Sequence, residues 1–147
     1  MTSKEIIDLL PYQHPFLFVD TLTQVSENGV EGLYTFHENA AFYKGHFKDH
    51  PITPGVILTE VMAQIGVVCL GIFLVKDDLQ EAAQPQIALT SHQIDFFLPV
   101  YPGAQVRVVS EKEYFRFNKL KCKVQLFNDA NELVCRGYIS GMIKANE

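Results

Sequence analysis

The middle of the chain carries a run of apolar residues, from Val61 to Val75, in which Gln64 is the only polar side chain. Charged residues flank the run on both sides, so its uninterrupted part is shorter than the ~18–20 residues that a bilayer requires. A helix that is apolar nearly all round, yet too short to cross a membrane, is typical of the buried centre of a soluble fold. We therefore expect one core helix that begins at Pro54-Gly55 and ends near Val75.

Four shorter segments precede this helix. Ser3 to Leu10 predicts a short amphipathic helix, with Ser3 as its N-cap and Pro11 as its stop. Phe16–Val25 and Val30–Phe36 predict two strands, because both are rich in aromatic and branched residues and are separated by the turn signal Asn28-Gly29. The stretch from His37 to Pro54 has no steady period and predicts an ordered loop, a common place for functional residues.

Four strand-like runs follow the helix, after a polar connection from Lys76 to Pro85 that we expect to be flexible. They are Gln86–Phe97, Ala104–Phe115, Leu120–Phe127 and Glu132–Ile143. Strands do not alternate with helices, which argues against a doubly wound fold. The order predicts one α+β domain, residues 1–147, in which an antiparallel sheet wraps around the long central apolar helix. Gly66 and Gly71 would let the sheet or a second subunit approach that helix, and the long sheet edges predict pairing into a dimer.

Charge and cysteine content narrow the function. A net charge of −5 argues against nucleic-acid binding, which needs a basic surface. The three cysteines, Cys69, Cys122 and Cys135, form no CxxC pair, so buried thiols are favoured over redox or metal roles. The N-terminus lacks the apolar run of a signal peptide. Together with free thiols, this predicts a cytoplasmic protein.

Glu60 is the carboxylate most suited to proton transfer, because apolar residues of the core helix surround it. Helical geometry places Val56, Glu60, Gln64, Val67 and Gly71 along one stripe, so Glu60 and Gln64 are stacked neighbours. A carboxyl in apolar surroundings has its charged form disfavoured, which suits a general acid that Gln64 holds by a hydrogen bond. The alternative is a glutamate that only benefits from the helix dipole.

The loop before the helix supplies a histidine, and the helix start supplies backbone donors. His46 is a candidate base, although a loop histidine alone is more often simply solvated. Gly55 leaves its N–H unobstructed at a helix start, where free amides favour developing negative charge; it also serves as a turn residue. His46 and His50 have the spacing of a metal pair, but Pro51 disfavours a helix there and no further ligand completes a set. We expect no metal.

Three motifs in order carry a resemblance to a known family. Gly45-His46-Phe47, followed by the stretch from Pro54 to Gln64, closely resembles the signature of the 3-hydroxyacyl-acyl-carrier-protein dehydratases, the FabZ/FabA-like hotdog-fold enzymes of fatty acid synthesis. Leu10 to Asp20 is similar to the N-terminal motif of that family, and Leu98 to Gly103 to its later strand-corner motif. The matches span nearly the whole chain, so together they are far more specific than any one alone.

The resemblance implies a reaction, a site and partners. His46 would be the catalytic base and Glu60 the catalytic acid, with Gly55 polarising the thioester carbonyl. Removal of water from a 3-hydroxyacyl thioester would give the trans-2-enoyl thioester. The other residues expected to bind substrate are Gln64, Val56, Phe47 and Pro54. The resemblance further implies a homodimer with His and Glu from opposite subunits, possible assembly into a trimer of dimers, and an acyl carrier protein as partner. No cofactor is expected beyond the acyl-phosphopantetheine that arrives as substrate.

The chain departs from the family at several positions. Lys48 stands where a proline is usual, Phe97-Leu98 replace a basic pair, and Pro11-Tyr12-Gln13 replace Pro-His-Arg. These changes bear on how a carrier protein docks and leave a specialised pathway open, such as one that makes an aryl-polyene or polyketide-like chain. The alternatives are a hotdog thioesterase, in which a carboxylate directs water at the thioester, and a non-catalytic hotdog subunit that binds an acyl chain.

Overall fold

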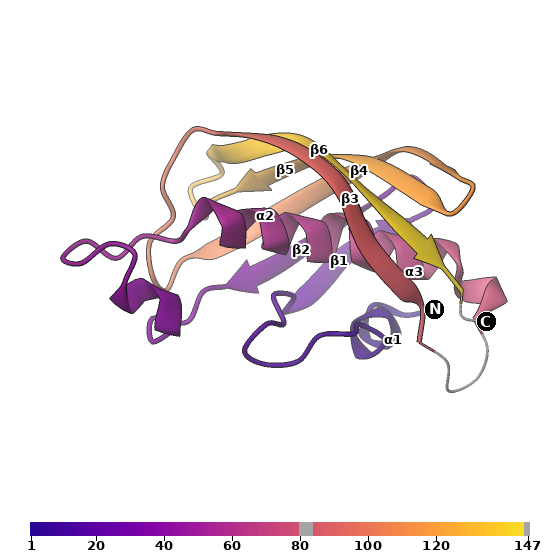
Figure 1. Ribbon diagram of the computed structural model, residues 1–147, viewed down its shortest axis with the longest axis horizontal. Coiled ribbons are helices and arrows are strands. Elements are labelled where there is room, and N and C mark those ends of the chain that lie inside the picture. Colours follow the sequence, from indigo (N-terminus) through magenta and orange to yellow (C-terminus); the bar gives the residue numbers. More distant parts are fainter. Residues whose placement is uncertain (80–83, 146–147) are drawn as a thin grey trace.

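A computed structural model describes residues 1–79 and 84–145, which form one antiparallel sheet curled around one long helix (Figure 1). The predicted architecture is confirmed. The six strands lie in the order β1-β2-β4-β5-β6-β3. Their bounds are Thr21–Ser26 (β1), Gly29–Thr35 (β2), Gln86–Phe96 (β3), Gln105–Arg116 (β4), Lys119–Phe127 (β5) and Leu133–Lys144 (β6). The four predicted C-terminal strands thus begin and end within one residue of their expected bounds.

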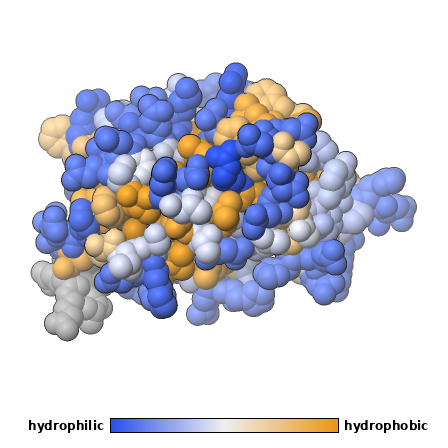
Figure 2. All heavy atoms as spheres, turned by 180° about the vertical axis from the view of Figure 1, so that it is seen from behind, coloured by the Kyte–Doolittle hydropathy of each residue, from blue (hydrophilic) through white to orange (hydrophobic). Residues whose placement is uncertain are grey.

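The central helix runs from Gly55 to Leu74 and fills the concave side of the sheet. It consists of α2 (Gly55–Ala63), a π-helical segment (Gln64–Cys69) and α3 (Leu70–Leu74). Its length and composition alone would allow it to cross a membrane, but 72% of its apolar window is buried inside the protein. It is therefore the core helix of a soluble fold, as predicted. Viewed from behind, the molecule presents mainly polar side chains, with apolar ones gathered in a band across the middle (Figure 2).

Two glycines of the central helix let the sheet approach it closely. A Cβ atom added at Gly66 would lie 3.1 Å from a methyl carbon of Val124 on β5. One added at Gly71 would overlap the side chain of Ile143 on β6. The prediction that these glycines admit the sheet is confirmed, and it explains how a helix can lie so close to two strands without a gap.

The π-helical segment was not predicted, and a contact from the sheet accompanies it. Ser110 of β4 donates its hydroxyl to the carbonyl oxygen of Gly66 at 2.8 Å. Both groups are buried, so this hydrogen bond satisfies a carbonyl inside the irregular turn. The stripe of side chains expected from Val56 to Gly71 assumed a regular α-helix. Hydrogen bonds between residues five apart change which side chains lie on the same face, so the stripe is interrupted in this segment.

The N-terminal region differs from expectation in two places. The first helix, α1, covers Ser3–Asp8, and its N-cap is Thr2 rather than Ser3, because Thr2 and Glu5 form a reciprocal capping box. The predicted strand from Phe16 is wrong in its first half, since β1 begins only at Thr21. The predicted turn is present one residue earlier, at Glu27 and Asn28, because Gly29 already pairs with Ser26 as the first residue of β2. The strand after it is confirmed by β2.

Two short 3₁₀ helices complete the fold, Ala41–Lys44 in the loop before α2 and Lys76–Asp78 after α3. The connection expected to be flexible, from Lys76 to Pro85, lies partly outside the described residues, at 80–83. The two edges of the sheet differ. Helix α1 packs beside β1, whereas β3 is an edge strand of eleven residues, nine of them exposed in the single chain.

Candidate active site

The loop from His46 to Ile52 is closed by backbone hydrogen bonds, which gives His46 a defined position. Ile52 N–H donates to the carbonyl of His46 at 2.8 Å, and Phe47 and His50 exchange two further backbone bonds. Below the loop, Thr53 donates its N–H to the carbonyl of Val100 at 2.8 Å, which fastens the loop to the corner before β4. The expected ordered loop is therefore present, and it leads directly into α2.

The ring of His46 has one nitrogen committed to the backbone. Its Nδ1 lies 2.9 Å from the carbonyl oxygen of Ile52. A carbonyl oxygen only accepts, so Nδ1 carries the proton and the neutral ring keeps a free lone pair on Nε2. The ring of Phe47 stacks on the imidazole of His46. The two ring centroids are 4.1 Å apart and the interplanar angle is 25°. The half-buried ring is thereby oriented with an unprotonated nitrogen available.

Gln64 is fully buried and links three parts of the structure. Its Oε1 accepts the N–H of Phe18 at 2.8 Å, and its Nε2 donates to the carbonyl of Phe16 at 3.0 Å and to Oε2 of Glu60 at 2.8 Å. The hydrogen bond predicted between Gln64 and Glu60 is present. The two contacts with Phe16 and Phe18 are ones that sequence reasoning missed, because they join positions almost fifty residues apart.

This network fixes the chemistry of the Glu60 carboxyl. A backbone N–H on one side and a backbone carbonyl on the other allow the Gln64 amide only one orientation, so both Nε2 protons are engaged. Oε2 of Glu60 must then accept from Gln64, which leaves Oε1 as the carboxyl oxygen better placed to carry a proton. Burial raises the pKa of Glu60, while the hydrogen bond from Gln64 opposes that shift in part. The protonated form is therefore favoured to a higher pH than for a solvated glutamate.

A small cavity of about 40 Å³ adjoins Glu60. Its lining is mostly apolar and comes from the core helix, the β3 edge, the neighbouring strand β6 and the N-terminal segment: Tyr12, Glu60, Ala63, Val67, Val68, Ile87, Ala88, Leu89 and Gly141. Ligand sites for small molecules typically measure ~300–1,000 Å³. This cavity, which reaches Val67 beside the exposed edge strand, is much smaller than such a site in the single chain.

Tyr12 is a second feature that the sequence did not single out. It lines the same cavity as Glu60. Burial, and to a smaller extent the charge of Glu60, raises the pKa of Tyr12 to about 12, so its phenol stays neutral. The signal that could have found it is the N-terminal motif, where Tyr12 stands at a position that departs from the resembled family.

The start of α2 offers backbone donors without a side-chain cap. Pro54 is the N-cap residue and makes no side-chain hydrogen bond to the helix. The first amides of a helix have no intrahelical acceptor, so those of Gly55 and its neighbour are available. A Cβ added at Gly55 would lie 3.3 Å from the ring of Phe96, which therefore packs directly over the helix start. Val56 is 77% exposed in the single chain and faces away from the core.

The predicted site residues fall into two groups in one chain. Phe47 stacks on His46 in the loop before α2, and Pro54 and Gly55 begin that helix. Glu60 lines the cavity beside β3, whose lining does not include His46, and Gln64 donates a hydrogen bond to Glu60. Among the described residues, no group of three or more His, Cys, Asp or Glu side chains is arranged to hold a metal ion. Within a single chain, His46 is therefore not part of the cavity that Glu60 lines.

Comparisons with known proteins place the chain in a family. A family model described as a FabA-like domain matches residues 10–137. A 3-hydroxyacyl-[acyl-carrier-protein] dehydratase FabZ of Geotalea uraniireducens is 34% identical over 118 residues, 79% of each chain. The FabZ dehydratase of Ehrlichia canis is 32% identical over 151 residues, covering 98% of this chain and 96% of its own.

Solved structures agree with the fold. The dehydratase heterocomplex ApeI:P from Xenorhabdus doucetiae matches with a TM-score of 0.77 at 14% identity, over 95% of this chain and 91% of that one. A hypothetical thioesterase with coenzyme A from Streptococcus pneumoniae matches with a TM-score of 0.61 at 10% identity, over 86% of each chain. At such identities the likeness concerns the fold alone. The chain belongs to the FabA-like family of hotdog-fold proteins, and its relatives over most of its length are FabZ dehydratases.

Proposed function

We propose that the protein dehydrates a 3-hydroxyacyl thioester, carried on an acyl carrier protein, to the trans-2-enoyl thioester in fatty acid, aryl-polyene or polyketide-like biosynthesis. The tautomer that the Ile52 carbonyl favours for His46, together with the buried carboxyl of Glu60, carries the proposal. One side chain presents a lone pair on Nε2, and the other favours a proton on Oε1. An elimination of water needs both, a base for the carbon next to the carbonyl and an acid for the departing hydroxyl.

The steps follow from these groups. Nε2 of His46 takes the proton from C2 of the substrate, and negative charge develops on the thioester oxygen. The free amide at Gly55 stabilises that oxygen. The C3–O bond then breaks as Oε1 of Glu60 protonates the hydroxyl, which leaves as water. Proton transfer from the His46 imidazolium through solvent to the Glu60 carboxylate restores both groups. Phe47, Pro54 and Val56 would contact the substrate around the helix start.

The site needs a second subunit. Because His46 and Glu60 face different surroundings in one chain, we propose a homodimer in which the His46 of one protomer meets Glu60 of the partner subunit. The open β3 edge supports this arrangement, since it borders the Glu60 cavity and leaves Leu89 and Phe96 exposed. A trimer of such dimers is compatible with it. The three buried free thiols suit a cytoplasmic location, which completes the proposal.

Two substitutions test the assignment. With a 3-hydroxyacyl pantetheine thioester as substrate, His46→Ala and Glu60→Gln should each lower kcat by at least about 10²-fold, the usual contribution of a general acid or base. His37→Ala and Glu27→Gln, both at exposed positions, are the matched controls. The product is identified by mass and by the ultraviolet absorbance of the conjugated enoyl group.

The same assay separates the alternatives. Release of free 3-hydroxy acid in place of the enoyl thioester would show a thioesterase. Binding of the thioester with no product at all would show a non-catalytic acyl-binding subunit. Near-normal turnover by either variant would remove the proposed roles of His46 and Glu60.

A further inference from the structure

The orientation of His46 depends on a single peptide unit, the one that joins Ile52 to Thr53. The carbonyl oxygen of Ile52 lies 2.9 Å from Nδ1 of His46, and the N–H of Thr53 donates to the carbonyl of Val100 at 2.8 Å. Because a peptide unit is planar, its carbonyl and its N–H cannot turn independently. Whatever holds Thr53 in place therefore also holds the oxygen that orients the imidazole.

Thr53 is held by its side chain as well as by its backbone. Its Oγ1 lies 2.6 Å from the hydroxyl oxygen of Tyr43, and we call these two groups the hydroxyl pair. Thr53 is only 4% exposed and Tyr43 6% exposed, so each buried hydroxyl has the other as its hydrogen-bond partner. Pro54 follows directly and restricts the backbone of Thr53 to extended conformations.

Tyr43 connects the hydroxyl pair to the core. It lies in the 3₁₀ helix Ala41–Lys44, where its N–H donates to the carbonyl of Ala40 at 3.1 Å. Its ring belongs to the hydrophobic core and packs beside that of Phe42, with the two centroids 4.6 Å apart. Burial raises the pKa of Tyr43, so its phenol stays neutral and can donate or accept in the pair. Thr53 is thus tied to a fixed residue that lies earlier in the chain.

The hydroxyl pair closes the loop that carries the base. Tyr43 precedes His46 and Thr53 follows it, so the pair joins the two ends of this segment. Inside the loop, the N–H of Ile52 donates to the carbonyl of His46 at 2.8 Å. That inner bond joins His46 to Ile52, whereas the hydroxyl pair and the bond from Thr53 to Val100 fasten the Ile52–Thr53 peptide to the rest of the protein.

We propose that Tyr43 and Thr53 are positioning residues for the base. The hydroxyl pair holds the Ile52 carbonyl where it keeps the proton of the neutral imidazole on Nδ1 and leaves the lone pair on Nε2. Without the pair, the carbonyl can turn away from the ring, and the proton can move to Nε2, the nitrogen that has to accept the substrate proton. This inference rests on the proposed function for the role of His46, and on the hydrogen bonds of the loop for its geometry.

Three variants separate positioning from simple support of the fold. Tyr43→Phe and Thr53→Val each leave one buried hydroxyl without its partner and should lower the free energy of unfolding. The double variant Tyr43→Phe, Thr53→Val removes both hydroxyls while nearly keeping the shapes of both side chains, so it should regain most of that loss. If a single variant does not fold, the double variant alone carries the test.

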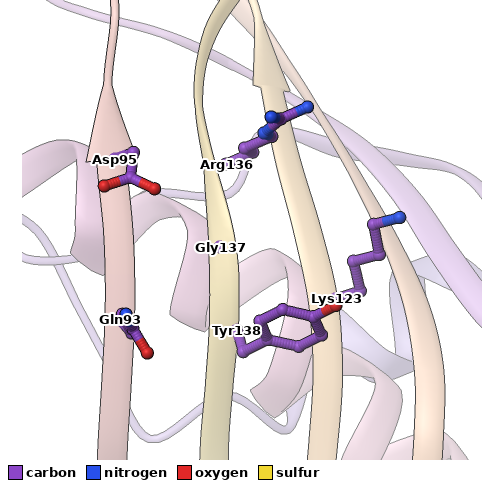
Figure 3. A pocket seen from close by; sticks show the side chains of 6 residues that line it. All are labelled: Gln93, Asp95, Lys123, Arg136, Gly137 and Tyr138. Atoms are coloured by element: carbon purple, nitrogen blue, oxygen red, sulfur yellow. The ribbon is translucent and has the colours of Figure 1, made fainter.

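The kinetic test uses the 3-hydroxyacyl pantetheine thioester as substrate. The double variant should be about as stable as the unaltered protein and yet have a kcat lower by about tenfold or more, because its base is misplaced. KM should stay nearly unchanged, since neither hydroxyl is among the expected substrate contacts. Thr53→Ser keeps a hydroxyl at this position and should retain most of the activity. The matched control is Tyr138→Phe, because Tyr138 lies with Lys123 and Arg136 at a depression on the face of the sheet that has the helix behind it (Figure 3).

Nuclear magnetic resonance measures the tautomer without any substrate. Long-range hydrogen–nitrogen correlation spectra at alkaline pH show which ring nitrogen of a neutral histidine carries the proton. The spectrum of His46→Ala assigns the signals of His46 among the five histidines. The proton should be on Nδ1 in the unaltered protein, in Thr53→Ser and in Tyr138→Phe. In the double variant a substantial share of it should shift to Nε2.

Two results would overturn the positioning role. One is recovery of kcat together with stability in the double variant, which would leave the hydroxyl pair with a role in folding only and the proposed dehydration intact. The other is a His46 tautomer that is the same in the double variant as in the unaltered protein. If the unaltered protein turns over no 3-hydroxyacyl thioester but the tautomer still depends on the hydroxyl pair, the proposed function fails and the positioning of His46 stands.

Discussion

The Glu60 carboxyl links the stability of the fold to pH. Burial raises its pKa above the ordinary value of 4.5. A carboxyl whose pKa is raised by folding stabilises the folded state fully below the unfolded value, and that contribution is lost as pH rises through the folded value. Glu60→Gln stays neutral, so its stability relative to the unaltered protein should increase as pH rises from about 4 to 8.

Urea unfolding at several pH values measures this difference. Glu27→Gln, at an exposed turn position, provides the control with the same chemical change. A stability difference for Glu60→Gln that does not vary with pH would mean that the folded protein does not disfavour the Glu60 carboxylate. The rate of dehydration should follow the same group, declining on the alkaline side as the carboxyl loses its proton.

If Gln64 positions the Glu60 carboxyl, as proposed, its loss should affect both stability and the pH profile. In Gln64→Met, the N–H of Phe18 and the carbonyl of Phe16 lose their partners. Each group left without a partner costs about 1–3 kcal/mol, so the free energy of unfolding should fall by about 2–6 kcal/mol. The lost hydrogen bond to Glu60 had opposed the rise of its pKa, so the alkaline limb of the rate profile should move to higher pH.

The matched control for this substitution is Gln24→Met on the exposed side of β1. Denaturant unfolding and the pH dependence of kcat/KM are measured on both variants. A loss of stability with no movement of the alkaline limb would leave Gln64 with a structural role only.

At the level of elements, the contact between α3 and β6 depends on the absence of one side chain. Gly71→Ala would add a methyl group that overlaps Ile143, which is fully buried. The gain of up to about 1 kcal/mol in helix propensity is expected to be outweighed by an overpacking cost of about 1–3 kcal/mol. Ile143→Val removes the overlapping methyl and alone should cost about 0.5–1.5 kcal/mol.

A double-mutant cycle measures the coupling between the two positions. Gly71→Ala with Ile143→Val should be more stable than the sum of the single effects by over about 0.5 kcal/mol. The free energy of unfolding of the four proteins provides the measurement. Additive effects would show that the helix shifts away from β6 instead of overlapping Ile143.

The elements that the sequence predicts well are those fixed by local pattern. Strands β3 to β6 lie within one residue of expectation. Along β4 and β5 buried and less buried residues alternate, as in a sheet with one buried face, whereas β3 is mostly exposed in the single chain and is marked by its composition and the turn residues around it. The segment before Thr21 was assigned wrongly because the backbone groups of Phe16 and Phe18 bond to the side chain of Gln64 and not to a neighbouring strand. No local window contains that partner.

The same distinction applies to the candidate site. The Gln64–Glu60 hydrogen bond was predictable because residues four apart on a helix are neighbours. The π-helical turn could not be predicted in this way. It is accompanied by a hydrogen bond from the hydroxyl of Ser110 on β4 to Gly66, and Ser110 is distant in the sequence. Tyr12 likewise reaches the Glu60 cavity only through the path of the N-terminal segment across the helix.

For the whole molecule, the distribution of the site over two surfaces has a consequence for assembly. The Glu60 cavity is lined by residues of the edge strand β3 and does not include His46. In the homodimer proposed above, formed along β3, each of two sites would take its base and its acid from different chains. In such a dimer, His46→Ala or Glu60→Gln in both chains would inactivate both sites. Pairing one chain of each kind would restore one intact site.

A mixed dimer tests this directly. Chains with His46→Ala and with Glu60→Gln are co-expressed with two different affinity tags, and the doubly tagged dimer is purified. One of its sites then holds both substitutions and the other holds intact His46 and Glu60, so turnover per dimer should recover to about half of the unaltered value. Each parent homodimer should remain inactive. A mixed dimer without activity, alongside an active unaltered protein, would place both groups of each site in one chain, and the sheet edge at β3 would then have no catalytic role.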